Sequence, residues 1–366
     1  ITVKATMHIG IAKPAIGEEE KQAVLAVLES GQLVQGAQVE AFERAFAAYH
    51  GARHAVAMSN GTTALMATMM AHGIGPGDEV IVPSFSFFAT ASAVLSVQAT
   101  PVFADINPTT FCLSPDAAEA AITPRTAAIM PVHLYGHPAD MVRFEAICRK
   151  RGLLLLEDAA QAHGAAINGR RVGTWGTASF SFYPSKNMTT GEGGMVLTND
   201  DEIARKLRMI RNQGMNQQYY HEVVGYNFRM TNLAAAIGRA QLDRLPDWTQ
   251  QRIANAAYFN AHLKSVTTPT TAPGYTHVFH QYTVRTPDGV DRDAVVKRLN
   301  ERGIGARVYY PMPIHRQPVF QQMGGYAAVS LPETEKATRQ VLSLPVHPML
   351  TDEERAYIVQ EVNAVC

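Results

Sequence analysis

This 366-residue sequence has few cysteines and no net charge. The three cysteines, Cys112, Cys148 and Cys366, are far apart and include no Cys-x-x-Cys pair, so we predict no disulfide framework, no metal site and a reducing cytoplasm. Lys and Arg number 32, as do Asp and Glu, and the formal net charge is zero. Without a basic excess to neutralise phosphates, a general nucleic-acid binder is excluded.

Long hydrophobic runs and a targeting segment are also missing. Apolar runs such as Leu153–Leu156 are far below the ~18 residues of a membrane span, and no basic start followed by an apolar core indicates a secretory signal. Charged residues make up 17% of the chain, against roughly 25% in an average globular protein. This shortfall favours a large core and a buried subunit interface, and the length indicates two domains, at ~150 residues each.

What the sequence does contain is a series of short apolar strands separated by helices. Strands are expected at 55–58, 80–82, 101–104, 127–130 and 153–156, with helices at 18–28, 39–49, 62–72 and 140–150. This alternation predicts parallel βαβ units and an α/β fold. After Asp158 an alternating strand at 178–183 and a Gly-rich turn at 191–194 indicate a hairpin beside the parallel sheet.

The last third of the chain has a different composition. Pro246 and the Thr/Pro-rich stretch 267–274 mark a change, followed by a strand at 278–285 and a helix at 291–302. We therefore predict a large domain of residues 1–245, with an N-terminal helical segment, and a smaller α+β domain of residues 246–366.

Four features at predicted strand ends carry chemistry, although each has an ordinary structural explanation. Asp158 ends an apolar parallel strand, where open α/β sheets place ligands, but it can equally cap a helix. Residues 59–63 link a strand to a helix and suit a phosphate, or are an ordinary capped turn. Lys186 follows a buried strand and is either a reactive amine or a surface lysine. Phe85, Phe87 and Phe88 follow another strand end, and either one of these rings covers a planar cofactor or all three pack in the core.

Together these features are the groups that one particular cofactor requires for binding. A phosphate cradle, an aromatic ring, a carboxylate and a reactive lysine on the strand ends of one sheet are what pyridoxal phosphate requires. The lysine holds the aldehyde of the cofactor, and the acid keeps its pyridine nitrogen protonated. A dinucleotide-binding oxidoreductase is disfavoured because no Gly-x-Gly-x-x-Gly follows the first strand.

At this point the sequence resembles the DegT/DnrJ/EryC1/StrS sugar aminotransferases, which are fold-type-I pyridoxal-phosphate enzymes. The resemblance extends over almost the whole chain and is strongest at 157–164, 180–187 and 191–194. It implies a central, mostly parallel sheet flanked by helices. It also implies pyridoxal 5'-phosphate as the cofactor, with pyridoxamine phosphate as the intermediate form, and a homodimer with shared sites.

The resemblance also assigns residues. Lys186 matches the Schiff-base lysine that moves the proton, and Asp158 matches the acid that pairs with the pyridine nitrogen. The other implied cofactor contacts are Gly61, Thr62, Thr63, Phe87, Gln161, Ser181 and, from the neighbouring subunit, Asn227. Segments that line the sugar site of the family contain His163, Tyr183, Arg229, Tyr309 and His315. Because Lys186 is a lysine, the dehydratase branch of the family, which has histidine there, is disfavoured.

We therefore predict a transaminase that moves an amino group from an amino acid, glutamate by default, to a keto group of a nucleotide-linked hexose, in amino-sugar and polysaccharide biosynthesis. Two alternatives stay open: an aminotransferase acting on a cyclitol ketone, and a non-catalytic regulator with the same fold. The sugar, the nucleotide, the carbon that is aminated and the choice between glutamate and glutamine are not defined by the sequence.

Overall fold

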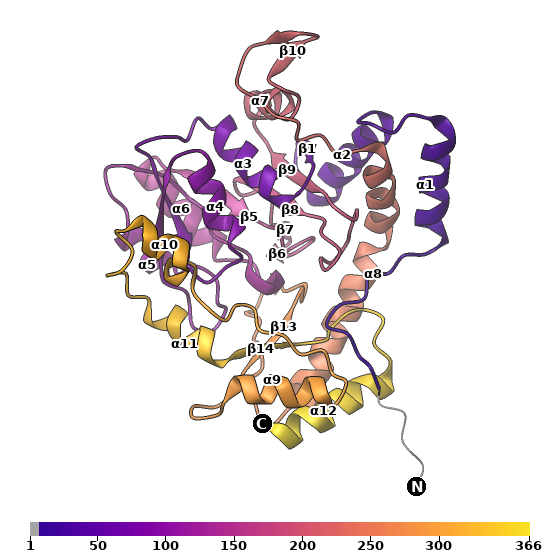
Figure 1. The fold of residues 1–366 in the computed structure, drawn as a ribbon, viewed down its shortest axis with the longest axis vertical. Helices are drawn as coiled ribbons and strands as arrows, with labels where there is room; N and C mark the ends of the chain where they lie inside the picture. Colours follow the sequence, from indigo (N-terminus) through magenta and orange to yellow (C-terminus); the bar gives the residue numbers. More distant parts are fainter. Residues whose placement is uncertain (1–6) are drawn as a thin grey trace.

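A seven-stranded sheet forms the centre of the molecule in the computed structural model, which describes residues 7–366 (Figure 1). Its spatial order is β1-β9-β8-β5-β4-β2-β3. The pairs from β8 to β3 are parallel, whereas β9 runs antiparallel to both β8 and β1. The strands are β1 (His54–Met58), β2 (Glu79–Pro83), β3 (Thr100–Ala104), β4 (Thr126–Ile129), β5 (Leu154–Asp158), β8 (Thr177–Ser181) and β9 (Gly194–Thr198).

Helices cover both faces of this sheet because its strands are apolar on both sides. In β2, Val80 and Val82 pack with α3 (Gly61–Ala71) and α4 (Ala89–Ser96), whereas Ile81 packs on the other face with α5 (Pro115–Ala120) and α6 (Met141–Arg151). Next to β1 and β9, α7 (Asp201–Arg211) shares the face of α3, and α2 (Ala37–His50) covers the opposite face. The predicted α/β architecture and the β8–β9 hairpin are confirmed.

A smaller unit is built around the antiparallel pair β13 (Tyr282–Arg285) and β14 (Val341–Leu344). Its core includes side chains of α9 (Arg292–Glu301) and α12 (Asp352–Val365), together with Phe259. The remaining strands are the short β6 (Ala166–Ile167), β7 (Arg170–Arg171), β10 (Met215–Gln217), β11 (Tyr220–His221) and β12 (Tyr275–Thr276).

The two predicted domains are joined by a long helix rather than by a loop. Helix α8 (Asn232–His262) runs through Pro246, contacts α1 (Glu18–Ser30) and α2 with its first part, and reaches the small unit with its second (Figure 1). The predicted boundary at 245/246 therefore falls inside α8. Moreover, Ile9 pairs with Ile304 and packs in the core of the small unit. The domain division stays a prediction.

Part of the C-terminal region returns to the large domain. Ile314, Phe320 of α10 (Pro318–Met323) and Leu331, just before α11 (Pro332–Gln340), pack in the same core cluster as the α3/α4 face of β2. As a result, residues 309–316 pass the carboxyl ends of the strands. Within residues 7–366, no helix has the length and apolarity that a bilayer crossing needs.

Candidate active site

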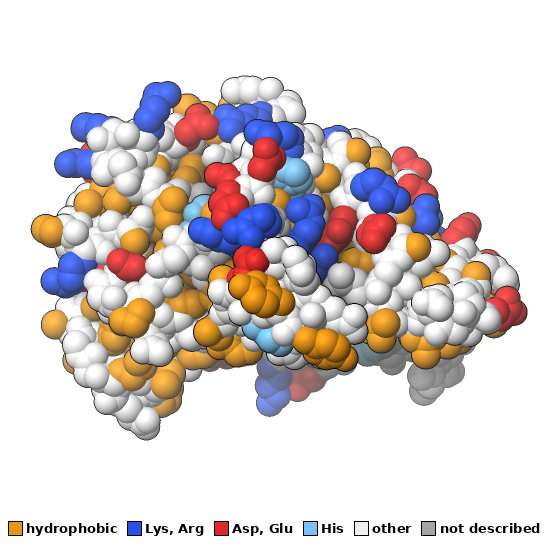
Figure 2. Space-filling view, turned by 90° about the horizontal axis from the view of Figure 1, so that it is seen from above, with side chains coloured by type: hydrophobic (Ala, Val, Ile, Leu, Met, Phe, Trp, Pro, Cys, Tyr) orange, Lys and Arg blue, Asp and Glu red, His pale blue; other side chains and the backbone are white. Residues whose placement is uncertain are grey.

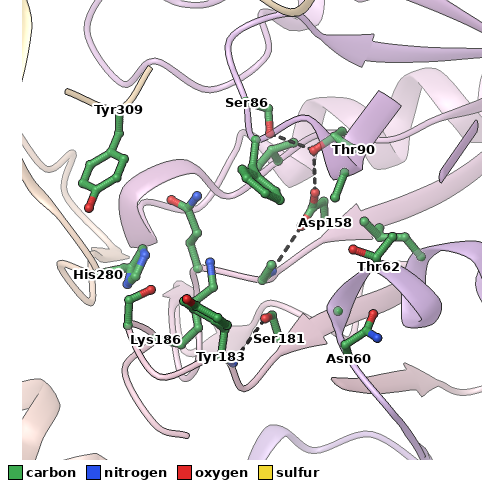
Figure 3. A pocket seen from close by; sticks show the side chains of 18 of the residues that line it. Asn60, Thr62, Ser86, Thr90, Asp158, Ser181, Tyr183, Lys186, His280 and Tyr309 are labelled. Atoms are coloured by element: carbon green, nitrogen blue, oxygen red, sulfur yellow. Dashed lines mark hydrogen bonds between the residues drawn. The ribbon is translucent and has the colours of Figure 1, made fainter. Parts of the chain in front are cut away.

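The carboxyl ends of β2, β5 and β8 surround a cavity of about 920 Å³ (Figure 3). Asp158 is the last residue of β5 and Ser181 the last of β8, while Ser86 and Phe87 follow β2. All four line the cavity, and so does Lys186. Because parallel strands end at the same edge of a sheet, residues far apart in the sequence meet here, as expected for ligand sites in open α/β folds.

Lys186 lies on the turn that follows β8 and reaches the cavity from one side. Its backbone N–H donates to the carbonyl oxygen of Tyr183 at 2.9 Å, and the adjacent Asn187 side chain donates to the carbonyl oxygen of Val278 at 3.0 Å. Burial lowers the pKa of the Lys186 amine to about 8, and the negative charge of Asp158 opposes this shift. The turn thus holds an amine that is far easier to deprotonate than an ordinary lysine.

Asp158 is 4% exposed and faces Lys186 across the cavity. Its Oδ2 accepts a hydrogen bond from the Thr90 hydroxyl at 2.8 Å, and its Oδ1 accepts one from the Ala160 N–H at 3.2 Å. Burial raises the pKa of Asp158 above its usual value, and these two hydrogen bonds and the charge of Lys186 act against burial. No α-helix begins at this point, because residues 159–164 form turns. Asp158 is therefore not a helix N-cap, although it does accept the Ala160 N–H.

The N-terminus of α3 opens onto the cavity opposite Lys186. Asn60 caps the helix by accepting the Thr63 N–H at 2.9 Å, and the amides of Gly61 and Thr62 precede it in the same turn. A side chain at Gly61 would put its Cβ 2.7 Å from the Cβ of Ser181, so glycine allows the helix end to approach β8. Helix N-terminal amides with adjacent hydroxyl groups form a site for a phosphate.

An amide and two rings line the wall of the cavity between these groups. Gln161 accepts the Tyr135 N–H at 2.7 Å and donates from Nε2 to the Tyr310 hydroxyl at 3.2 Å. The Phe87 ring is 58% exposed, and its centroid lies 6.3 Å from that of Tyr310. Tyr310 therefore contacts two side chains that the sequence assigns to cofactor binding.

Of the five residues predicted to contact the sugar, two line the cavity. Tyr183 is 51% exposed at its rim. Tyr309 lies on the opposite side, and its carbonyl oxygen accepts a hydrogen bond from the Tyr135 hydroxyl (Figure 3). Both positions are open to a substrate that enters from solvent.

His163 and His315 do not line the cavity. His163 is fully buried among the rings of Phe46, Phe180 and Phe182, and burial lowers its pKa to about 3. His315 is also fully buried: its Nδ1 lies 2.7 Å from the Ser84 hydroxyl, and it fastens the segment of Tyr309 and Tyr310 to the end of β2. Neither histidine is among the residues that line the cavity, and their contact with a substrate stays a prediction.

Asn227 and Arg229 also lie away from the cavity of their own chain. Asn227 is exposed, and the Arg229 Nη1 donates to Asn212 at 2.8 Å. This placement is compatible with a role in a neighbouring subunit, and that role stays a prediction.

Sequence reasoning missed several cavity residues, namely Ser86, Thr90, Tyr135, His280, Gln281 and Tyr310. Thr90 had a weak signal, since it is a polar residue in the first turn of the helix 89–96, three positions after Phe87. Tyr310 is adjacent to Tyr309, which the sequence did identify. His280 had no signal, because it lies in a stretch predicted as a strand, which the structure begins only at Tyr282.

The donor set fits pyridoxal 5'-phosphate. The helix end at Gly61 provides a cradle that a side chain would fill, Asp158 provides a buried carboxylate, Lys186 a desolvated amine and Phe87 an aromatic face. These are the groups that a phosphate, a pyridine nitrogen, an aldehyde and a ring require. Fold and site together define an aminotransferase of the pyridoxal-phosphate type.

The family model described as the DegT/DnrJ/EryC1/StrS aminotransferase family matches residues 14–363, and the chain belongs to this family. The family depends on pyridoxal phosphate, and a solved relative from Bacillus subtilis contains its pyridoxamine form. The cofactor and the reaction class predicted from the sequence are therefore confirmed.

Individual relatives cover nearly the whole chain. It is 46% identical over 343 residues to a "pleiotropic regulatory protein" of Geobacillus stearothermophilus, covering 92% of this chain and 91% of that one. It is 45% identical over 341 residues to UDP-N-acetyl-3-dehydro-alpha-D-glucosamine 3-aminotransferase of Acidithiobacillus ferrooxidans, with the same coverage. The structure of Streptomyces venezuelae DesV in complex with a ketimine intermediate matches with a TM-score of 0.91 and 42% identity, covering 95% of this chain and 94% of that one.

Proposed function

We propose that this protein transfers an amino group from an amino acid, with glutamate as the default donor, to a keto group of a nucleotide-linked hexose. The observation that carries the proposal is that Lys186 and Asp158 face one cavity of about 920 Å³, with the N-terminus of α3 at its end. The resemblance to an aminotransferase named for a UDP-linked keto-sugar supports this substrate class. The product would be an amino sugar for a polysaccharide or a glycosylated metabolite.

Different residues of the cavity would bind the cofactor and transfer the proton. When bound, pyridoxal phosphate supplies the aldehyde that carries the amino group and a ring that accepts the electron pair released at the substrate carbon. The Gly61 and Thr62 amides and the Ser181 hydroxyl would bind the phosphate, and the Asp158 carboxylate would keep the pyridine nitrogen protonated. With a pKa of about 8, roughly a tenth of the Lys186 amines are neutral at pH 7, and a neutral Nζ takes a proton from the substrate carbon.

The charges around the cavity indicate that one chain does not complete the site. The donor carries carboxylates and the sugar nucleotide carries phosphates, but none of the described residues that line the cavity is an arginine. Asn227, which is exposed, and Arg229, which is partly buried, flank Phe228 and supply an amide and a guanidinium. We assign them to the site of a second copy, in a homodimer.

The surface of this segment supports the dimer. Residues 219–226 expose Tyr219 by 83%, Val224 by 75% and Tyr226 by 44%, beside a groove of about 490 Å³ lined by Met66, Met70, Ile74 and Val97. Figure 2, seen from the end that carries β10 and β11 in Figure 1, shows hydrophobic side chains exposed among intermixed charges. A second copy of the chain would cover this apolar surface. The three free cysteines fit the reducing cytoplasm in which we place the reaction.

The substrate class is tested by loading the protein with pyridoxamine phosphate and adding candidate ketones. We expect nucleotide-linked keto-hexoses to restore the visible absorption of the pyridoxal form, and free cyclitol ketones to leave it absent. Restoration by a cyclitol ketone alone would overturn the sugar assignment while leaving the aminotransferase chemistry intact.

The shared site is tested by mixing two inactive variants under conditions that exchange subunits. Lys186→Ala and Asn227→Ala carry their defects on opposite sides of the proposed interface, so a mixed dimer has one intact site. Random mixing then restores about a quarter of the wild-type sites. The matched control mixes Lys186→Ala with Asp158→Asn, whose defects lie in the cavity of the same chain, and restores nothing. Equal results from both mixtures would reject a site shared through Asn227.

A further inference from the structure

The Asp158 carboxylate lies at the end of a chain of two hydroxyl groups (Figure 3). The Ser86 Oγ is 2.7 Å from the Thr90 Oγ1, which is in turn 2.8 Å from the Asp158 Oδ2. Ser86 is 3% exposed, Thr90 is fully buried and Asp158 is 4% exposed. Ser86 comes from the loop after β2 and Thr90 from the first turn of α4. The two hydrogen bonds therefore link these two elements to the end of β5.

The number of available protons determines which group donates in each of these two hydrogen bonds. An ionised aspartate only accepts hydrogen bonds, so the single proton of the Thr90 hydroxyl is donated to Asp158. The Thr90 oxygen is then free to accept, and Ser86 donates to it. A hydroxyl that receives a hydrogen bond becomes a better donor, so Ser86 strengthens the bond from Thr90 to the carboxylate.

Thr90 supplies the shortest contact that holds this carboxylate. The other oxygen, Oδ1, receives only the Ala160 N–H at 3.2 Å. The charged and titratable groups that face Asp158 act at longer range: Lys186 across the cavity, His133 from the segment after β4, and Tyr310 from the segment before α10. Two neutral donors at fixed positions therefore counter the burial of the charge and set the plane of the carboxylate.

We infer that Thr90 is a positioning residue for Asp158, keeping the carboxylate ionised and aimed into the cavity, with Ser86 reinforcing it. The inference rests on the proposed function for the task of Asp158 at the pyridine nitrogen. The contact itself does not depend on that function, because it is present in the chain alone.

The first experiment measures this contact in the protein without cofactor. Carbon NMR of ¹³C-aspartate-labelled protein follows the titration of Asp158, and Asp158→Asn identifies its signal. Thr90→Val keeps the shape of the side chain and removes the hydroxyl, and it should raise the pKa of Asp158 by about one to two pH units. Thr90→Ser keeps the hydroxyl and should stay near wild type, and Ser86→Ala should give a smaller rise. A Thr90→Val titration equal to that of wild type would overturn the inference.

The second experiment measures the consequence for cofactor binding. Thr90→Val should weaken pyridoxal phosphate binding about tenfold, with Thr90→Ser restoring it. The matched probe is a deaza analogue of the cofactor, in which CH replaces the pyridine nitrogen. Because this analogue has no nitrogen for Asp158 to hold, wild type and Thr90→Val should bind it equally. An equal loss for both ligands would show that Thr90 only supports the fold, which contradicts a positioning role.

The two experiments separate the inference from the proposed function. If the wild-type protein bound no pyridoxal phosphate while Thr90→Val still raised the pKa of Asp158, the function would fail and the positioning contact would stand. If the cofactor bound and transamination proceeded while Thr90→Val changed neither readout, the function would stand and the inference would fail.

Discussion

The cavity and the segment 219–229 differ in which kind of side chain is buried: the cavity buries charged groups, whereas the segment exposes apolar ones. In the cavity, Asp158 is buried and Lys186 is partly buried, and each forms hydrogen bonds within its own chain. On the segment, apolar side chains such as Val224 are exposed to solvent. Burying charges and exposing apolar groups both cost free energy, so each pattern indicates something missing from the isolated chain. The cofactor of the family fills the need at the cavity, and we propose a second copy of the chain for the segment.

The largest expected effect comes from removing the amine of the cavity. Lys186→Ala should lower transamination by roughly 10⁴-fold or more, because the group that moves the proton is lost. Lys150→Ala, at an exposed lysine on α6, is the control and should retain wild-type turnover. Steady-state assays measure both variants. A cellular phenotype that persisted with Lys186→Ala would assign that phenotype to the regulatory alternative, a role indicated by the name of one relative.

The next effect tests the segment. Val224→Asp places a charge on the surface that we assign to the dimer, and it should yield monomers with activity reduced at least about tenfold. Val142→Asp, at a 51% exposed valine on α6, is the matched control and should stay dimeric. Light scattering gives the molar mass of each. A wild-type protein that is already monomeric and fully active would remove the difference between the two regions.

A third prediction concerns the pH dependence of Lys186 in the protein without cofactor. Its pKa is lowered to about 8, so the neutral amine increases about tenfold per pH unit up to pH 8 and then levels off. Acylation by an amine-selective reagent, followed by peptide mass spectrometry, should show this plateau for Lys186 well below the pKa of a free lysine side chain, about 10.4. Asp158→Asn removes the charge that opposes the shift and should move the plateau to lower pH. A reactivity profile for Lys186 that matched that of a free lysine side chain would contradict the lowered pKa of this amine.

The smallest expected effect lies at the wall of the cavity. Tyr310→Phe removes the acceptor of the Gln161 amide and should weaken cofactor binding by about five- to tenfold, with stability changed little. Tyr326→Phe removes another partly buried hydroxyl, which donates to the Pro101 carbonyl oxygen at 3.2 Å away from the cavity, and should leave binding unchanged. Titration of absorption with pyridoxal phosphate compares the two.

The sequence predicted those parts of the fold and site that depend on local patterns. Apolar strands such as 80–82 and their intervening helices predict the α/β sheet, and the predicted strand ends indicate Asp158 and Lys186, whereas Phe87 follows from the family resemblance. Long-range contacts carried no such signal. Pro246 was interpreted as a boundary, yet α8 continues through it, and His163 packs among phenylalanines that are distant in sequence. The return of residues 309–320 to the large domain, which brings Tyr310 to Gln161, follows from tertiary packing alone.

The central claim is that Lys186 and Asp158 hold pyridoxal phosphate in a working aminotransferase. The most direct test is the absorption spectrum of the purified protein with pyridoxal phosphate, before and after adding glutamate, with Lys186→Ala alongside. The account predicts a visible band for wild type that glutamate converts to the near-ultraviolet band of the pyridoxamine form, and no conversion for Lys186→Ala. A folded wild-type protein that develops no visible band would contradict it.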